Sequence, residues 1–167
     1  MPTMTSVSVP TTVKRYRFDS EEFDTLDYDE WLSRYAKYAM FAIEYNDGIV
    51  YDVTEWVMDL QLTHNELDKE GAGRDAKTGK MVRKILADKH EIQINLMPRT
   101  PHSVAHRILM LVCDGDTFTL YWQHPCRANK ITSAKFYCST VNFGAQRYEK
   151  GSNKCFYTGM TFKVIEV

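Results

Sequence analysis

The sequence predicts a mainly β fold of the α+β class, an antiparallel β-sandwich or barrel with one flanking helix and an extended N-terminal arm. From residue 39 onward, most segments alternate apolar and polar residues with a period of two, which is typical of half-buried strands. One segment, 101–113, instead repeats its apolar residues at helical spacing. The first 35 residues follow neither period, so we divide the chain into an extended, acidic arm, 1–35, and one β domain, 36–167.

A long hairpin forms the centre of the predicted domain. Its two arms, 55–65 and 81–97, each place apolar side chains on one face and polar side chains on the other. The side chains expected to point inward are Trp56, Met58, Leu60, Leu62, Leu86, Ile92, Ile94 and Leu96. Between the arms lies the long hairpin loop 67–80, in which Asp68 to Lys80 contains three glycines and no large apolar residue. Such a loop cannot pack on its own core, so it is either mobile or a surface for a partner.

Shorter elements flank this hairpin. An earlier hairpin is predicted over 39–53, where two alternating segments surround Asn46-Asp47-Gly48, residues that tolerate positive φ. A helix is predicted from Pro101 to about Cys113, with Thr100 as its N-cap. After the helix we expect strands at 117–123, 131–140 and 157–167, with 147–154 as the loop before the last strand. This order suits two antiparallel sheets with a helix covering one face or end.

The N-terminal arm allows two interpretations. Seven acidic residues and no basic one lie in 19–30, and such a stretch is commonly a solvated face. However, apolar residues are interleaved with the acids, namely Phe18, Phe23, Leu26, Tyr28, Trp31 and Leu32. These side chains could dock on a neighbouring subunit, with the acids facing a basic surface such as Arg83, Lys84 and Lys89. Docking within one monomer is expected to be marginal, which predicts protease sensitivity over 1–30 in the isolated protein. One or two helical turns are expected in 29–37.

Overall composition and charge favour no particular class of partner. The formal net charge is -1 and the pI is about 6.5, which gives no general electrostatic reason to bind nucleic acid or an anionic membrane. No apolar run is long enough to span a bilayer, and no export signal is evident, so we expect no membrane partner. The four cysteines, Cys113, Cys126, Cys138 and Cys155, form no CxxC pair and are expected to be reduced thiols.

Motifs for catalysis or metal binding fail when their context is tested. His102 and His106 are four residues apart on the predicted helix, but no HExxH pattern surrounds them. His124 and Cys126 flank a proline at a strand end, which is a weak ligand signal. The glycines of the hairpin loop are not followed by Gly-Lys-Ser/Thr and a helix, as a phosphate-binding P-loop requires. We therefore expect no catalytic, cofactor-binding or metal-binding residues, and no enzymatic activity.

A β-barrel nucleic-acid-binding module remains the alternative function. The central hairpin carries several basic residues, although interspersed acids leave a local net charge of only +2. Five aromatic residues lie on predicted strands, as stacking platforms do, and about half of them should alternate inward into the core. They are Phe118, Tyr121, Trp122, Phe136 and Tyr137.

Five short series follow one another along the β domain. They are GAGRDAKTGKMVRK (71–84), HEIQI (90–94), MPRTPH (97–102), FYCS (136–139) and YTGMTFKVIE (157–166). In this order they resemble the sequences of small tail proteins encoded by bacteriophages and prophages. The resemblance covers about 49–167; it does not extend to 1–40, and 124–129 departs from the pattern.

The resemblance implies a structural protein of the virion with a tail-tube-like fold, placed in the tail tube or its distal or baseplate end. Such proteins assemble into rings in the host cytoplasm, with six copies as one option. The implied partners are other copies of the chain and other phage tail proteins, with DNA only as passing cargo if the protein lines a tube. The residues expected at the subunit interface are Gly71, Gly73, Arg74, Lys77, Lys80, Arg83, Lys84, Phe23 and Trp31.

Overall fold

Strands dominate the part of the chain that the computed structural model describes, which comprises residues 10–16, 23–34, 41–45, 47–68, 73–74, 77–79, 81–82, 85–125 and 131–167. In chain order the elements are β1 (Thr12–Tyr16), β2 (Phe23–Asp27), α1 (Tyr28–Arg34), β3 (Phe41–Glu44), β4 (Val50–Asp52), the 3-10 turn η1 (Thr54–Trp56), β5 (Val57–Asp68), β6 (Gly73–Arg74), β7 (Met81–Val82), β8 (Ile85–Leu96), β9 (Thr100–Pro101), α2 (His102–Cys113), β10 (Phe118–Gln123), β11 (Ile131–Asn142), β12 (Ala145–Glu149), β13 (Lys154–Thr158) and β14 (Thr161–Glu166).

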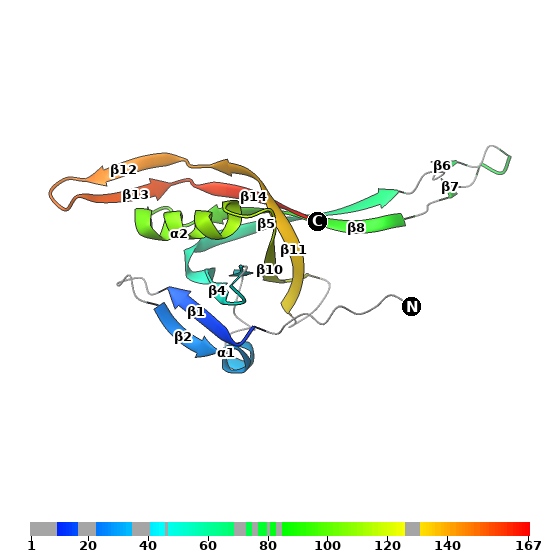
Figure 1. The fold of residues 1–167 in the computed structure, drawn as a ribbon. Helices are drawn as coiled ribbons and strands as arrows, with labels where there is room; N and C mark the ends of the chain where they lie inside the picture. Colours follow the sequence, from blue (N-terminus) through cyan, green and yellow to red (C-terminus); the bar gives the residue numbers. More distant parts are fainter. Residues whose placement is uncertain are drawn as a thin grey trace.

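The main sheet has nine strands in the order β2-β1-β4-β3-β10-β11-β14-β8-β5. Its neighbouring strands are antiparallel, except that β1 and β4 run parallel. The sheet curls, with the long strand β11 arching across it (Figure 1). A second sheet has the order β12-β13-β9, and β6 and β7 form a short ribbon. The predicted class, mainly β with one main flanking helix, is confirmed; the main sheet is a curled, half-open barrel.

Helix α2 covers one face of the curled sheet. Its buried side chains recur at helical spacing and are Val104, Ala105, Ile108, Leu111 and Val112. They pack in one core with Ile92, Ile94 and Phe162 from neighbouring strands. Full burial of each of the larger apolar side chains, such as Ile108 or Phe162, stabilises the fold by about 1.5–3 kcal/mol. The helix predicted over 101–113 is confirmed, whereas its N-cap is Pro101 rather than Thr100.

The hydroxyl of Thr100 has a different role from the predicted cap. It donates to the carbonyl oxygen of Met97 over 2.9 Å, and Thr100 is buried. Its backbone belongs to β9, which pairs with β13 through Tyr157. Because this strand pairing fixes Thr100 ahead of the helix, its side chain closes the turn after β8 and does not cap α2.

A smaller core lies on the opposite face of the sheet, under α1. It contains Val13, Trp31, Ala42, Val50 and Tyr121, all of them buried. Ala42 and Tyr121 alternate with residues of the larger core, so β3 and β10 are buried on both faces here. The described part of the predicted arm is therefore two strands and a helix joined to the main sheet, and α1 confirms the helical turns expected near 29–37.

Three sequence predictions need correction. The register between β5 and β8 shifts between Val57 and Asp59, so a β-bulge at Met58 turns that side chain outward, where it is 50% exposed. The predicted loop 147–154 belongs instead to a hairpin formed by β12 and β13. The predicted strand 157–167 is divided at Gly159, whose φ of 74° is left-handed, into β13 and β14 of two different sheets.

Candidate subunit-interaction surface

The hairpin of β5 and β8 extends well beyond the core. Its two strands of twelve residues remain paired from Val57 opposite Leu96 to Asp68 opposite Ile85. Figure 1 shows this hairpin leaving the body of the molecule toward the ribbon of β6 and β7. Strand β5 is also the last strand of the nine-stranded sheet, so its outer edge has no strand partner among the described residues. An unpaired edge of this length is a template for pairing with another chain.

The predicted interface residues of the hairpin tip are partly visible. Gly73 and Arg74 form β6 and pair with Val82 and Met81 of β7. Lys77 is exposed at the turn. The remaining predicted tip residues, Gly71, Lys80, Arg83 and Lys84, lie outside the described residues. The tip is thus a β-ribbon where the sequence indicated a loop, and Lys77 is the predicted interface residue whose side chain is seen to be accessible.

Trp31 lies in the interior of its own subunit, unlike the expectation that it docks on a neighbour. Its side chain is fully buried, and its indole Nε1 donates to Asp52 Oδ2 over 3.0 Å. The same carboxylate lies 3.5 Å from Arg15 Nε, and Arg15 also reaches Glu55 over 3.2 Å. Phe23, also predicted at the interface, opens β2 opposite Tyr16 of β1. Helix α1 is thus attached within the monomer by the buried Trp31 side chain and the buried carboxylate of Asp52.

Two tyrosines strengthen this inner attachment. The hydroxyl of Tyr121 donates to Glu44 Oε2 over 2.6 Å, and burial, with this hydrogen bond and the nearby carboxylate, raises the pKa of Tyr121. Burial also raises the pKa of Tyr28 of α1. The rings of Tyr28 and Trp31 both lie within 6.4 Å of the Tyr121 ring. The aromatic contacts of α1 are thus satisfied within its own chain.

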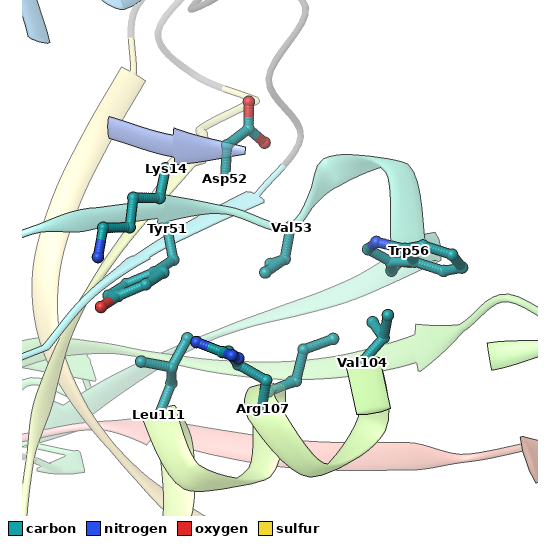
Figure 2. A pocket seen from close by; sticks show the side chains of 9 residues that line it. Lys14, Tyr51, Asp52, Val53, Trp56, Val104, Arg107 and Leu111 are labelled. Atoms are coloured by element: carbon teal, nitrogen blue, oxygen red, sulfur yellow. The ribbon is translucent and has the colours of Figure 1, made fainter. Parts of the chain in front are cut away.

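A seam beside this attachment contains a small cavity. Lys14, Tyr51, Asp52, Trp56 and Arg107 are among its lining residues, and Figure 2 shows how strands β1 and β4 face helix α2 there. Its volume of about 10 Å³ is roughly that of one water molecule. Lys14 Nζ lies 5.6 Å from the centre of the Tyr51 ring, and burial raises the pKa of Tyr51 to about 12. The cavity lies where β1 and β4 pack against α2, and it is too small to hold a substrate.

A second exposed hairpin, β12–β13, projects from the end of the molecule opposite the first hairpin (Figure 1). All five residues of β12 are exposed, and Tyr148 is 72% exposed. A groove of about 440 Å³ lies along this hairpin. Its lining residues are Pro98, Arg99, Arg147, Tyr148, Glu149, Phe156 and Thr158.

Several residues that line the groove contact one another. The guanidinium carbon of Arg99 lies 4.7 Å from the centre of the Phe156 ring, and Arg99 also reaches Glu149 over 3.6 Å. Thr158 donates to the carbonyl oxygen of Pro98 over 2.7 Å. Sequence reasoning missed this surface by assigning 147–154 to a loop. The turn residues Gly151-Ser152-Asn153 between two alternating segments were the available hairpin signal.

The histidine pair and the cysteines were the candidate metal ligands of the sequence. His102 and His106 stack with ring centres 6.3 Å apart, and His102 Nδ1 lies 3.1 Å from the Tyr157 hydroxyl. Among the described residues, no group of three or more His, Cys, Asp or Glu side chains is arranged to hold a metal ion. Cys113, Cys138 and Cys155 are free thiols, and Cys126 lies outside the described residues.

The aromatic residues considered for nucleic-acid stacking are mostly inside the molecule. Phe118, Tyr121, Trp122 and Phe136 are buried, and Tyr137 is 40% exposed. Buried rings cannot stack on bases. Most of the aromatic side chains on which the nucleic-acid alternative depended are therefore part of the core. No helix within the described ranges is long and apolar enough to cross a membrane.

Comparison with known proteins finds two structural similarities at low sequence identity. No family model and no curated protein matches the sequence. The structure is similar to a chain in the tail of an empty gene transfer agent particle with C6 symmetry, with 9% identity, a TM-score of 0.43 and coverage of 67% of this chain and 78% of that chain. It is also similar to a chain in the virion of a native gene transfer agent particle, with 9% identity, a TM-score of 0.44 and coverage of 76% and 90%. At this level of similarity, neither match by itself assigns the chain a function.

Proposed function

We propose that this protein is a structural component of a bacteriophage tail that forms ring-type oligomers in the tail tube or its distal or baseplate end. The observation that carries the proposal is the pair of hairpins, β5–β8 and β12–β13, which project from opposite ends of one body (Figure 1). A two-stranded hairpin is at best marginally stable without a neighbour to cover it. Two different surfaces at opposite ends of a subunit suit head-to-tail contact, which generates rings when the rotation closes.

The residues of the first hairpin support a contact with another chain. The unpaired edge of β5 offers backbone donors and acceptors along a strand of twelve residues. Lys77 at the turn is exposed, so this end of the hairpin presents a positively charged side chain at the surface. Two of the sequence series that resemble phage tail proteins, 71–84 and 90–94, lie in this hairpin. The resemblance and the exposed strand edge therefore point to the same part of the chain.

The second hairpin supplies the other contact. Tyr148 combines a large apolar ring with a hydroxyl, as interface residues commonly do, and is 72% exposed. Arg99 and Arg147 lie beside it in the groove and provide planar cations for carboxylates of a neighbour. The acidic α1 surface, including Asp29 and Glu30, is a complementary candidate on the next subunit.

Light scattering coupled to size-exclusion chromatography tests the proposal against the nucleic-acid alternative. The full chain would be run at about 0.1 M and about 0.5 M NaCl, with and without a labelled single-stranded oligonucleotide. We expect a ring-sized mass that persists at the higher salt concentration, because strand pairing and apolar contacts are little screened. A monomer at both salt concentrations would contradict the proposal, and salt-sensitive binding of the oligonucleotide would favour the alternative.

A further inference from the structure

The β12–β13 hairpin has one face that packs on its own subunit and one open face. Gln146 and Tyr157 lie opposite each other on the packed face. There the Tyr157 hydroxyl lies 3.1 Å from His102 Nδ1 of α2 and accepts a hydrogen bond from Gln146 Nε2 over 3.4 Å. The next pair along the strands, Arg147 and Phe156, points to the other face and lines the groove described above.

The direction of this hairpin is fixed within the monomer. The chain bends between β11 and β12 at Gly144, whose φ of 64° is left-handed. A Cβ at this position would lie 2.2 Å from the carbonyl oxygen of Thr158, so the bend requires glycine. Thr158 also donates to the carbonyl oxygen of Pro98, and β13 pairs with β9. The groove is therefore formed before a partner binds, which lowers the cost of docking.

The open face carries more positive than negative charge. Arg99 stacks on Phe156, with 4.7 Å from its guanidinium carbon to the ring centre, and also pairs with Glu149. Arg147 is exposed and makes no ion pair with any residue that the structure describes. Lys154, opposite Glu149, adds an exposed cation on the same face. Such a face suits a partner surface with a carboxylate beside an apolar side chain.

Helix α1 presents a surface of this kind. Asp29 and Leu32 are three residues apart on the helix, so they share a side. Asp29 is exposed, and Leu32 is 43% exposed. Glu30 pairs with Arg34, whereas no ion pair of Asp29 is found in the described ranges. Because the buried Trp31 holds the helix in place, this carboxylate and its apolar neighbour are displayed from a fixed element.

Two other exposed apolar residues also have an acid nearby. Met58 is followed by Asp59, but that carboxylate accepts a hydrogen bond from Asn95. Met110 and Asp114 lie one turn apart at the end of α2, which packs beside β13. In a head-to-tail contact the two surfaces lie apart on the subunit. Helix α1 lies across the body from β12–β13, whereas α2 lies next to this hairpin (Figure 1). Separation therefore favours α1.

We propose that the open face of the β12–β13 hairpin binds α1 of the next copy of this chain, with Arg147 paired to Asp29 and Leu32 packed near Phe156. This inference rests on the proposed function, and it names the residues of one contact in the ring. The contact is heterologous, so each subunit uses its groove on one neighbour and its α1 on the other. The attachment of α1 inside its own subunit positions the outward side chains for this contact.

Charge reversal on each side tests the contact in the full chain. Arg147→Glu and Asp29→Arg each place like charges across the contact, so we expect each variant alone to associate at least about tenfold more weakly than the wild type. Asp114→Arg is the matched control, because it reverses an exposed acid outside the contact, and it should assemble as the wild type does. Light scattering measures the mass, and urea unfolding shows that each variant is folded.

Combining the two reversals separates this pair from a general effect of charge. The double variant, and an equal mixture of the two single variants, again bring opposite charges together, so we expect both to recover the ring-sized mass. Single variants that assemble as the wild type does, or a folded double variant that stays monomeric, would overturn the inference and leave the proposed function intact. A wild-type chain that remains a monomer would overturn both.

Cross-linking of the wild type gives the answer without any variant. A carbodiimide joins carboxylates to lysines that lie in contact, and assembly from isotope-labelled and unlabelled chains identifies links between copies by mass spectrometry. We expect Lys154 of one copy to be linked to a carboxylate within 27–30 of another copy. Assembled rings in which Lys154 is linked between copies to Asp114, or is not linked to 27–30, would overturn the inference.

Discussion

The indole Nε1 of Trp31 donates to Asp52 Oδ2 over 3.0 Å, which joins the acidic N-terminal segment to strand β4 inside one subunit. Trp31 is fully buried and Asp52 is 8% exposed. Asp52 Oδ1 also accepts the backbone N–H of Thr54 over 3.1 Å. The two carboxylate oxygens are thus used within the chain. The attachment of this segment is therefore a feature of the monomer and does not require assembly.

Removing the Trp31 side chain should strongly destabilise the monomer. Trp31→Ala leaves a large cavity in the smaller core, which typically costs about 3–5 kcal/mol of unfolding free energy. Leu32→Ala is the matched control, because Leu32 is adjacent and 43% exposed, and its cost should be within about 0.5 kcal/mol. Urea unfolding of both variants measures the difference. Similar costs for the two variants would show that α1 is not anchored as described.

Limited proteolysis separates the two interpretations of the acidic segment. Because β1, β2 and α1 pack within the monomer, we expect cleavage of the isolated wild-type chain to spare the described residues 12–16 and 23–34. In Trp31→Ala the same ranges should be cut several times faster. Rapid cleavage within α1 of the isolated wild type would instead support the original expectation that this segment is ordered only by a neighbour.

The Cys138 thiol should resist alkylation in the folded chain. Burial, and then the neighbouring Cys113, raise the pKa of Cys138 from 9.0 to about 12, so the reactive thiolate is about a thousandfold rarer at neutral to mildly basic pH. This preference for the protonated form stabilises the fold below about pH 9 and is lost as the pH rises toward 12. Iodoacetamide labelling at pH 8, with peptide mapping of folded and urea-unfolded chain and Cys138→Ser as the assignment control, measures the effect. Folded and unfolded rates within tenfold of each other would contradict it.

The bulge at Met58 predicts opposite outcomes for two apolar side chains of the central hairpin. Ile94 is fully buried, so Ile94→Ala should cost about 2–5 kcal/mol of unfolding free energy. Met58 is 50% exposed, so Met58→Ala should change stability by less than about 0.5 kcal/mol. Thermal or urea unfolding gives both values. A large loss for Met58→Ala would mean that Met58 faces the core, as its place in the alternating pattern suggests.

The sequence correctly predicts elements whose apolar residues repeat with a strong local period. Its predictions are wrong where pairing with a distant strand determines which way a side chain faces or where a strand ends. The helix at 101–113 and the early hairpin around Gly48 have their signals within a few residues. The bulge at Met58 depends on the partner strand β8, so strict alternation along β5 assigns its face incorrectly. Likewise, the split at Gly159 follows from β13 joining β9 and β12 while β14 joins the main sheet.

The contacts that join His64, His90 and His124 could not be predicted from their spacing in the sequence. His64 and His90 are 26 residues apart, and His90 and His124 are 34 apart, whereas local motifs compare residues that are neighbours in the chain. In the sequence, His124 invites comparison only with Cys126. These contacts form because β5 pairs with β8, which sets His64 opposite His90, and because His124 at the end of β10 lies beside His90. The buried position of Trp31 is also a long-range outcome, since it depends on Asp52 of another hairpin.

The β12–β13 groove should affect assembly without affecting folding. Arg147→Glu reverses a groove charge on an exposed strand, so we expect loss of oligomers with an unchanged unfolding midpoint. Arg147→Lys keeps the charge and is the matched control, and it should still assemble. Light scattering reports the mass, and circular dichroism reports the fold. Normal oligomers in Arg147→Glu would remove this groove from the interface.

Replacing residues 71–79 by a short Asn-Gly turn, with assembly followed by electron microscopy and light scattering, tests the proposed ring most directly. The account predicts that the wild-type chain forms rings, whereas the shortened chain is a folded monomer with the unfolding midpoint of the wild type. Rings or tails of normal appearance from the shortened chain would contradict it.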